Sequence, residues 1–126
     1  MRVECSNERR IMTKEKLVRD KIPEIIRGKG EACKVRMPRS KNEKRKYADK
    51  KLEEEVAEYL TERGRKGKDY SREKVLEELA DIQELILHLA SLEGYSAKEL
   101  SAYRKAKNKS RGGFTKSFIW TRQVIK

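Results

Sequence analysis

The sequence predicts an all-α fold, and three observations support this. Residues 44–63 and 71–93 place apolar side chains at three- and four-residue spacing, as one face of a helix does. Both segments carry the same acidic pattern, 23 residues apart. SAKE, residues 96–99, has the sequence of a capping box that opens another helix. We therefore expect a helical bundle, with a single domain over residues 14–126 behind an irregular N-terminal arm, residues 1–13.

The region before the first long helix is expected to hold one short helix and one strand. In KLVRDKIPEIIRGKG, residues 16–30, Pro23 suits the first turn of a helix, and Gly28 and Gly30 end it. EACKVRMP, residues 31–38, has the alternation of a short strand.

Both long helices have recognisable ends. The first should run from about Lys44 to Arg63, and GRKGKDY, with its two glycines, interrupts the chain after it. Ser71 is a suitable N-cap for the second helix, which should end near Glu93, before Gly94.

The C-terminal region is expected to hold a third helix and a second strand. The helix that SAKE opens should end near Asn108, because SRGGF breaks its pattern. KSFIWTRQ then alternates aromatic with polar residues, as a strand does. We expect a small two-stranded β element that pairs residues 32–37 with residues 116–122.

The composition limits what the chain is. Hydrophobic residues make up 36% and charged residues 43% of the 126 residues, so a monomer would have a thin core and we expect oligomerisation. Cys5 and Cys33 form neither a CxxC pair nor a Cys/His cluster, which favours a reducing cytoplasm over a disulfide framework or a zinc site. No apolar run is long enough to span a membrane.

The net charge is +12, but the two signs are separated along the chain. Residues 1–50 carry 17 basic and 8 acidic side chains, residues 51–100 carry 8 and 13, and residues 101–126 carry 8 and none. A protein that only coats nucleic acid does not need an acidic centre, which makes nucleic acid an unlikely partner. A site that holds a divalent cation and a polyphosphate needs both signs close together.

The acidic centre contains an internal repeat. LEEEVAEY, from Leu52, and VLEELADI, from Val75, both read apolar–x–Glu–Glu–apolar–Ala–acid–apolar. The matching acids are Glu54 with Glu77, Glu55 with Glu78, and Glu58 with Asp81. One acidic stripe alone is usually a solvated helix face. Two helices with the same acids at the same phase favour a shared site instead.

Helical geometry places these acids beside the apolar faces. At about 100° per residue, Glu55 and Glu78 both fall about 60° from the first apolar residue of their repeat. In an antiparallel hairpin the two margins can meet in one groove, where the carboxylates would repel one another. A bound cation would remove that repulsion. Ligands that are all oxygen, without His or Cys, favour Mg²⁺, or Mn²⁺.

At this point the sequence resembles the MazG-like all-α nucleoside triphosphate pyrophosphohydrolases, whose hallmark is ExxE followed after a spacer by ExxD. Here Glu55-x-x-Glu58 is followed, after 19 residues, by Glu78-x-x-Asp81. KLVRDKIPEII ahead of these motifs and RGGF behind them resemble a house-cleaning branch of that family.

The resemblance implies a MazG-like helical bundle that cleaves a nucleotide between its α and β phosphates, in the cytoplasm, as a homodimer or homotetramer. Glu55, Glu58, Glu78 and Asp81 inherit the role of metal ligands, with Mg²⁺ as the cofactor. Glu54 or Glu77 could orient the attacking water, and Glu54 is the candidate base. The basic candidates for binding the triphosphate are Arg19, Lys21, Lys105, Lys109 and Arg111, each of which is equally well read as ordinary surface charge.

Other functions remain open at the level of sequence. The pI near 9.8 would suit a helical protein that binds nucleic acid. A bundle that only mediates assembly would also carry these patterns, and within the enzyme class phosphoribosyl-ATP hydrolysis is an alternative. His88 falls away from the apolar stripe, so it reads as a surface histidine.

Overall fold

The computed structural model describes residues 15–121, and within them the fold is all-α, as predicted. Four α-helices and one 3-10 turn occur in this range. The predicted N-terminal arm, residues 1–13, lies outside the described residues. In the described part of the chain, no helix is both long and apolar enough to be a membrane span. The elements are α1 (Ile22–Gly28), α2 (Lys41–Gly64), η1 (Gly67–Asp69), α3 (Arg72–Leu92) and α4 (Ala97–Arg111).

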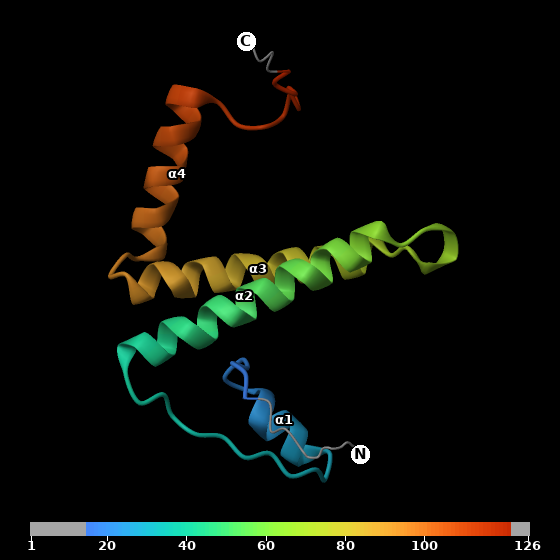
Figure 1. Ribbon diagram of the computed structural model, residues 1–126, viewed down its shortest axis with the longest axis vertical. Coiled ribbons are helices and arrows are strands. Elements are labelled where there is room, and N and C mark those ends of the chain that lie inside the picture. Colours follow the sequence, from blue (N-terminus) through green and yellow to red (C-terminus); the bar gives the residue numbers. More distant parts are fainter. Residues whose placement is uncertain (1–14, 122–126) are drawn as a thin grey trace, which may run out of the picture.

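Helices α2 and α3 form the antiparallel hairpin around which the other elements are arranged (Figure 1). Serine hydroxyls cap both helices: the Ser40 side chain accepts from the backbone N–H of Glu43, and that of Ser71 from Lys74. The Ser40 cap starts α2 three residues earlier than predicted. Across the far end of the hairpin, Arg45 Nε lies 3.0 Å from a carboxylate oxygen of Glu93.

The core is thin, as the composition predicts. Among the described residues, the buried side chains are Ala48, Val75, Leu85 and, unusually, Glu55. Burial of so few apolar groups supplies only a small part of the hydrophobic free energy that a domain of this length needs. The hairpin therefore leaves much of its apolar surface exposed.

The predicted β element is wrong for the residues that the structure describes. Residues 32–37 and 116–121 form no strand, and residue 122 lies outside the described range. The two segments lie on opposite sides of the hairpin, so neither offers the other a backbone partner (Figure 1). Met37 and Trp120 are 82% and 80% exposed, which shows that the alternating pattern does not mark a buried face here.

Helix α4 leaves the hairpin on the side opposite α1 (Figure 1). The predicted capping box is confirmed, because the Ser96 hydroxyl accepts from the Glu99 N–H and the Glu99 carboxylate accepts from the Ser96 N–H. The helix continues to Arg111, three residues past its predicted end. It stops where Gly112 takes a φ of 83°, a conformation that favours glycine.

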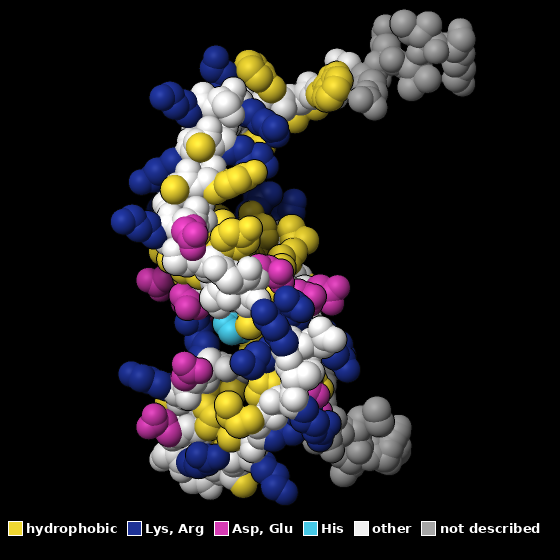
Figure 2. All heavy atoms as spheres, turned by 90° about the vertical axis from the view of Figure 1, so that its left-hand side faces the viewer, with side chains coloured by type: hydrophobic (Ala, Val, Ile, Leu, Met, Phe, Trp, Pro, Cys, Tyr) yellow, Lys and Arg dark blue, Asp and Glu magenta, His cyan; other side chains and the backbone are white. Residues whose placement is uncertain are grey.

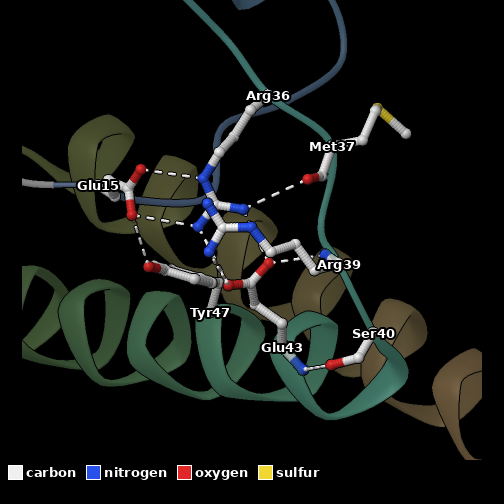
Figure 3. A network of polar contacts seen from close by, with 7 residues as sticks. All are labelled: Glu15, Arg36, Met37, Arg39, Ser40, Glu43 and Tyr47. Atoms are coloured by element: carbon white, nitrogen blue, oxygen red, sulfur yellow. Dashed lines mark hydrogen bonds and ion pairs between the residues drawn. The ribbon is translucent and has the colours of Figure 1, made fainter.

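The connector between α1 and α2, residues 29–40, is joined to α2 by a polar network (Figure 3). The Arg36 guanidinium lies between two carboxylates, with Nε 3.0 Å from Glu15 and Nη1 2.8 Å from Glu43. The Tyr47 hydroxyl donates to Glu15 at 3.0 Å. Hydrogen bonds from Arg36 lower the pKa of Glu15 and of Glu43 to about 2. The network joins the N-terminal segment, the connector and α2 through charge rather than apolar contact.

We expect Arg36→Gln to release this connector while the hairpin stays folded, because the amide cannot bridge two carboxylates. Trypsin should cleave within residues 29–41 several-fold faster, while the helical circular dichroism changes little. Arg39→Gln is the matched control, since Arg39 Nη1 reaches the same Glu43 only at 3.9 Å. Equal cleavage of the two variants would contradict the proposed role of Arg36.

Candidate metal centre

Three of the four predicted metal ligands converge where α2 meets α3. Glu55 comes from α2, and Glu78 and Asp81 come from successive turns of α3. One carboxylate oxygen from each of the three lies within 4.8 Å of the other two. Glu55 is only 5% exposed, and the other two are half-buried. The antiparallel hairpin thus joins the two acidic margins, as the repeat requires.

Glu55 also belongs to a second carboxylate trio. Its oxygen lies within 4.8 Å of oxygens from Glu54 and Glu58, all on α2. The fourth predicted ligand, Glu58, is therefore close to Glu55, although its side chain is exposed. Glu54, predicted as a base, belongs to this second trio as well. The site is two adjoining groups of acids that share one buried carboxylate.

Partial burial and the close approach of other acids raise the pKa of two of these carboxyl groups. The pKa of Glu78 rises from 4.5 to about 7, because of partial burial, the negative charge of Glu58 and a hydrogen bond with Glu55. The pKa of Glu58 is also raised, by partial desolvation of this otherwise exposed side chain and then by the charges of Glu55 and Glu54. The site therefore holds more negative charge than its surroundings neutralise.

Basic side chains offset part of this charge. Lys51 Nζ lies 2.9 Å from Glu54 Oε2 and 3.2 Å from Glu55 Oε2. Although burial acts to lower the pKa of Lys51, hydrogen bonds to the two glutamates raise it. The prediction missed Lys51, which its spacing could have revealed, since it stands three residues before Glu54 and four before Glu55 on one helix.

The N-terminal segment adds two more cations. Arg19 forms a hydrogen-bonded ion pair with Asp81, which raises the pKa of the guanidinium. Lys16 Nζ lies 3.7 Å from Glu54 Oε2. A basic segment from before α1 thus lies across the acids of the hairpin.

This segment and the hairpin enclose an open groove of about 710 Å³. The volume lies within the range of small-molecule sites, roughly 300–1,000 Å³. The predicted phosphate ligands Arg19 and Lys21 both line it. Glu84 and His88, one turn apart on α3, line it as well and were not predicted as site residues. Their i, i+4 spacing after the ExxD motif is the sequence signal that places them on the same face.

The other predicted phosphate ligands lie elsewhere. Lys105, Lys109 and Arg111 are exposed along α4 and do not line the groove of their own chain. Figure 2 shows basic side chains along the outer edge of this helix, separated from the groove by the hairpin. Their role in binding phosphate stays a prediction.

Comparison of the chain with models of protein families, with curated proteins and with solved structures finds no match. The resemblance to MazG-like hydrolases thus stays a prediction that rests on the motifs.

The raised pKa of Glu78 predicts how stability depends on pH in the presence of a chelator. Between pH 4.5 and about 7, folded Glu78 holds a proton that the unfolded chain releases. The free energy of unfolding contributed by this group is therefore largest at low pH and falls as pH rises through that window. Thermal unfolding at several pH values should show this fall.

Glu78→Gln should flatten the slope and raise the melting temperature at about pH 8. Glu77→Gln is the control, because Glu77 is exposed and belongs to neither trio. The lowered pKa values of Glu15 and Glu43 change the stability only below about pH 4.5, so these groups do not affect the slope between pH 4.5 and 7. An unchanged slope in Glu78→Gln would show that the carboxylates are not in repulsive contact.

Proposed function

We infer that this protein is a Mg²⁺-dependent pyrophosphohydrolase that cleaves a nucleoside triphosphate between its α and β phosphates. The observation that carries the proposal is the buried Glu55 carboxylate, which two acid trios share and which lines, with Asp81, a groove that also has basic side chains in its wall. The release of a nucleoside monophosphate and pyrophosphate suits a role in cleansing nucleotide pools, as the resemblance implies.

The donor set fits a hard divalent cation. All the close ligand atoms are carboxylate oxygens, the donors that Mg²⁺ and Mn²⁺ prefer. Glu55, Glu78 and Asp81 would hold one ion, and Glu58 extends the donor set beside them. The raised pKa of Glu78 comes first from partial burial and then from neighbouring negative charge, which a cation would neutralise. An ion bound there supplies charge neutralisation at the phosphate oxygens and lowers the pKa of bound water.

The chain's own residues supply binding and proton transfer. Lys21 and Lys16 at the groove rim would hold the phosphates as point charges, and Arg19 would bind them in a bidentate manner once released from Asp81. Glu54, which pairs with Lys51 at 2.9 Å, would accept a proton from the attacking water. That water attacks the α-phosphorus, and the bridging oxygen leaves with pyrophosphate.

The main competing function is sequence-independent binding of nucleic acid. The basic side chains along α4 favour it, since a row of cations neutralises phosphates without a metal. Binding of nucleic acid predicts an affinity for nucleic acid that falls steeply with salt concentration and does not change when a chelator is added. The hydrolase function instead predicts that the protein releases pyrophosphate and that a chelator stops this release.

We expect Glu55→Gln and Asp81→Asn each to lower Mg²⁺-dependent pyrophosphate release by more than roughly 100-fold, because each removes a charged metal donor. A panel of ordinary and modified nucleotides, phosphoribosyl-ATP included, provides the substrates. Glu53→Gln is the matched control, because Glu53 is exposed on the same helix and belongs to neither trio.

Circular dichroism would establish that the variants fold. Because the amides relieve repulsion, neither should be less stable than the parent in the presence of chelator. Activity that survives in both variants, or that persists in chelator, would exclude a metal-dependent hydrolase. A parent protein inactive on every nucleotide would favour the nucleic-acid function.

Arg19 and a metal ion are expected to compete for Asp81. Arg19→Gln should therefore tighten Mn²⁺ binding in the absence of nucleotide, by no more than roughly fivefold because the ion pair is exposed to solvent. The same change should raise KM for the nucleotide. Electron paramagnetic resonance of Mn²⁺ measures the first effect and initial rates the second.

Lys21→Gln serves as the comparison, since Lys21 lines the same groove but does not pair with Asp81. It should raise KM without tightening Mn²⁺ binding. Weaker Mn²⁺ binding in Arg19→Gln would instead mean that the arginine orients Asp81 for the ion.

A further inference from the structure

Two polar side chains of α3, Glu84 and His88, line the groove but have no part in the chemistry proposed above. Both side chains are exposed. The Ser91 hydroxyl donates to the backbone carbonyl of His88, not to its ring. Within residues 15–121, neither the His88 imidazole nor the Glu84 carboxylate forms a hydrogen bond or a salt bridge. Their polar atoms are therefore available to a molecule that enters the groove.

Helix α3 places these two residues in a row with a candidate metal ligand. Each residue of an α-helix adds about 100° of rotation and about 1.5 Å of rise. Viewed down the axis from Asp81, Glu84 and His88 fall about 60° and 20° to one side, and Leu85 falls about 40° to the other. Along the axis, Glu84 lies about 4.5 Å and His88 about 10.5 Å beyond Asp81. One stripe of the helix thus runs from the acids to the histidine.

The groove follows this stripe and has two different ends. Helices α2 and α3 run antiparallel (Figure 1), so the step from Asp81 to His88 has the same direction as the step from Glu55 back to Lys51. All four of these residues line the groove. We call the part at Glu55 and Asp81 the acid end. The part at His88, about two helical turns away, is the histidine end.

The groove also has an apolar wall. It is formed by the N-terminal segment, α1 and α3, through Leu17, Val18, Ile22, Ile26 and the buried Leu85. A metal ion and phosphates do not need such a wall, whereas a flat ring with polar edges does. A neutral imidazole adds one hydrogen-bond donor and one acceptor. Apolar contact and a few polar groups are what a nucleobase requires of its site.

Glu84 lies between the two ends. An ionised carboxylate only accepts hydrogen bonds, so it suits a group that carries hydroxyl donors and repels a phosphate. In dinucleotide-binding folds an acidic side chain binds the ribose 2′-hydroxyl in this way. In a nucleotide the sugar also lies between the phosphates and the base. The order of groups along the groove therefore matches the order of groups in a ribonucleotide.

We propose that a ribonucleotide lies along α3, with its α-phosphate at the acid end, its ribose hydroxyls at Glu84 and its base against His88 and Leu85. The assignment rests on the proposed function for the identity of the ligand. Glu84 then selects ribose over 2′-deoxyribose, and His88 binds the base. Both residues determine specificity, and neither touches the phosphorus that is attacked.

The orientation can be measured without hydrolysis, because His88 is the only histidine of the chain. In protein without a histidine tag, its ring protons are the only imidazole signals in the proton NMR spectrum. With Mg²⁺ and the α,β-methylene analogues of ATP, GTP, CTP and UTP, these protons should show nuclear Overhauser effects to protons of the base. Inorganic triphosphate should shift them much less. An analogue that binds without these effects would overturn the orientation.

Steady-state kinetics on the nucleotide panel tests both residues. His88→Ala should raise KM roughly three- to tenfold with kcat nearly unchanged, because a contact with the base is the same in the ground state and the transition state. The parent should prefer the best ribonucleotide to its 2′-deoxy counterpart by roughly tenfold in kcat/KM, and Glu84→Ala should bring this ratio close to one.

Gln83→Ala is the matched control, because Gln83 is exposed on α3 beside Glu84 but does not line the groove. It should keep both the KM and the ribose preference of the parent. A KM that His88→Ala leaves unchanged, or a preference that survives Glu84→Ala, would contradict the assignment of that residue.

The two proposals fail in different ways. Contact between a base and His88 in a protein that cleaves no nucleotide would refute the hydrolase and keep the orientation. Cleavage without that contact would refute the orientation and keep the hydrolase. A groove that binds none of the analogues would overturn both.

Discussion

The burial of the Glu55 carboxylate between two helices is the constraint on which the rest of the site depends. A buried carboxylate is unfavourable unless cations or hydrogen bonds compensate it. Lys51 compensates from the same helix at 3.2 Å, while Glu78 and Asp81 of the neighbouring helix add further negative charge. An apolar residue at position 55 would pack more easily at this contact. The carboxylate is thus difficult to explain as a device for stability, and easier to explain as a ligand.

The N-terminal segment and α4 have complementary relations to the hairpin. Helix α1 of the N-terminal segment has no buried residue, and this segment contacts the acids through Lys16 and Arg19. Helix α4 has no buried residue either, and its basic side chains do not line the groove of its own chain. Within residues 15–121, buried side chains occur only in the hairpin, so the N-terminal segment is held by its ion pairs and α4 by its attachment to α3.

The sequence predicted the features that depend on neighbouring residues. Helical periodicity, the caps at Ser71 and Ser96 and the duplicated acids all act within one or two turns, and the structure contains them. Lys51 was equally local but was not considered. The predicted strands do not form, because the alternating pattern of residues 32–37 indicates which side chains share a face but supplies no second strand for the backbone to pair with. The position of α4 also depends on distant packing, so the sequence could not show that Arg111 lies away from the groove of its own chain.

The ion pairs that hold the N-terminal segment across the acids have a consequence for the environment in which the protein works. Side chains in these pairs are largely exposed, with Arg19 at 57% and Lys16 at 52%. Counterions screen such pairs over a Debye length of about 8 Å at physiological ionic strength. Apolar burial within the hairpin does not respond in this way. The electrolyte around the molecule therefore sets how tightly the groove is covered, independently of how well the hairpin is folded.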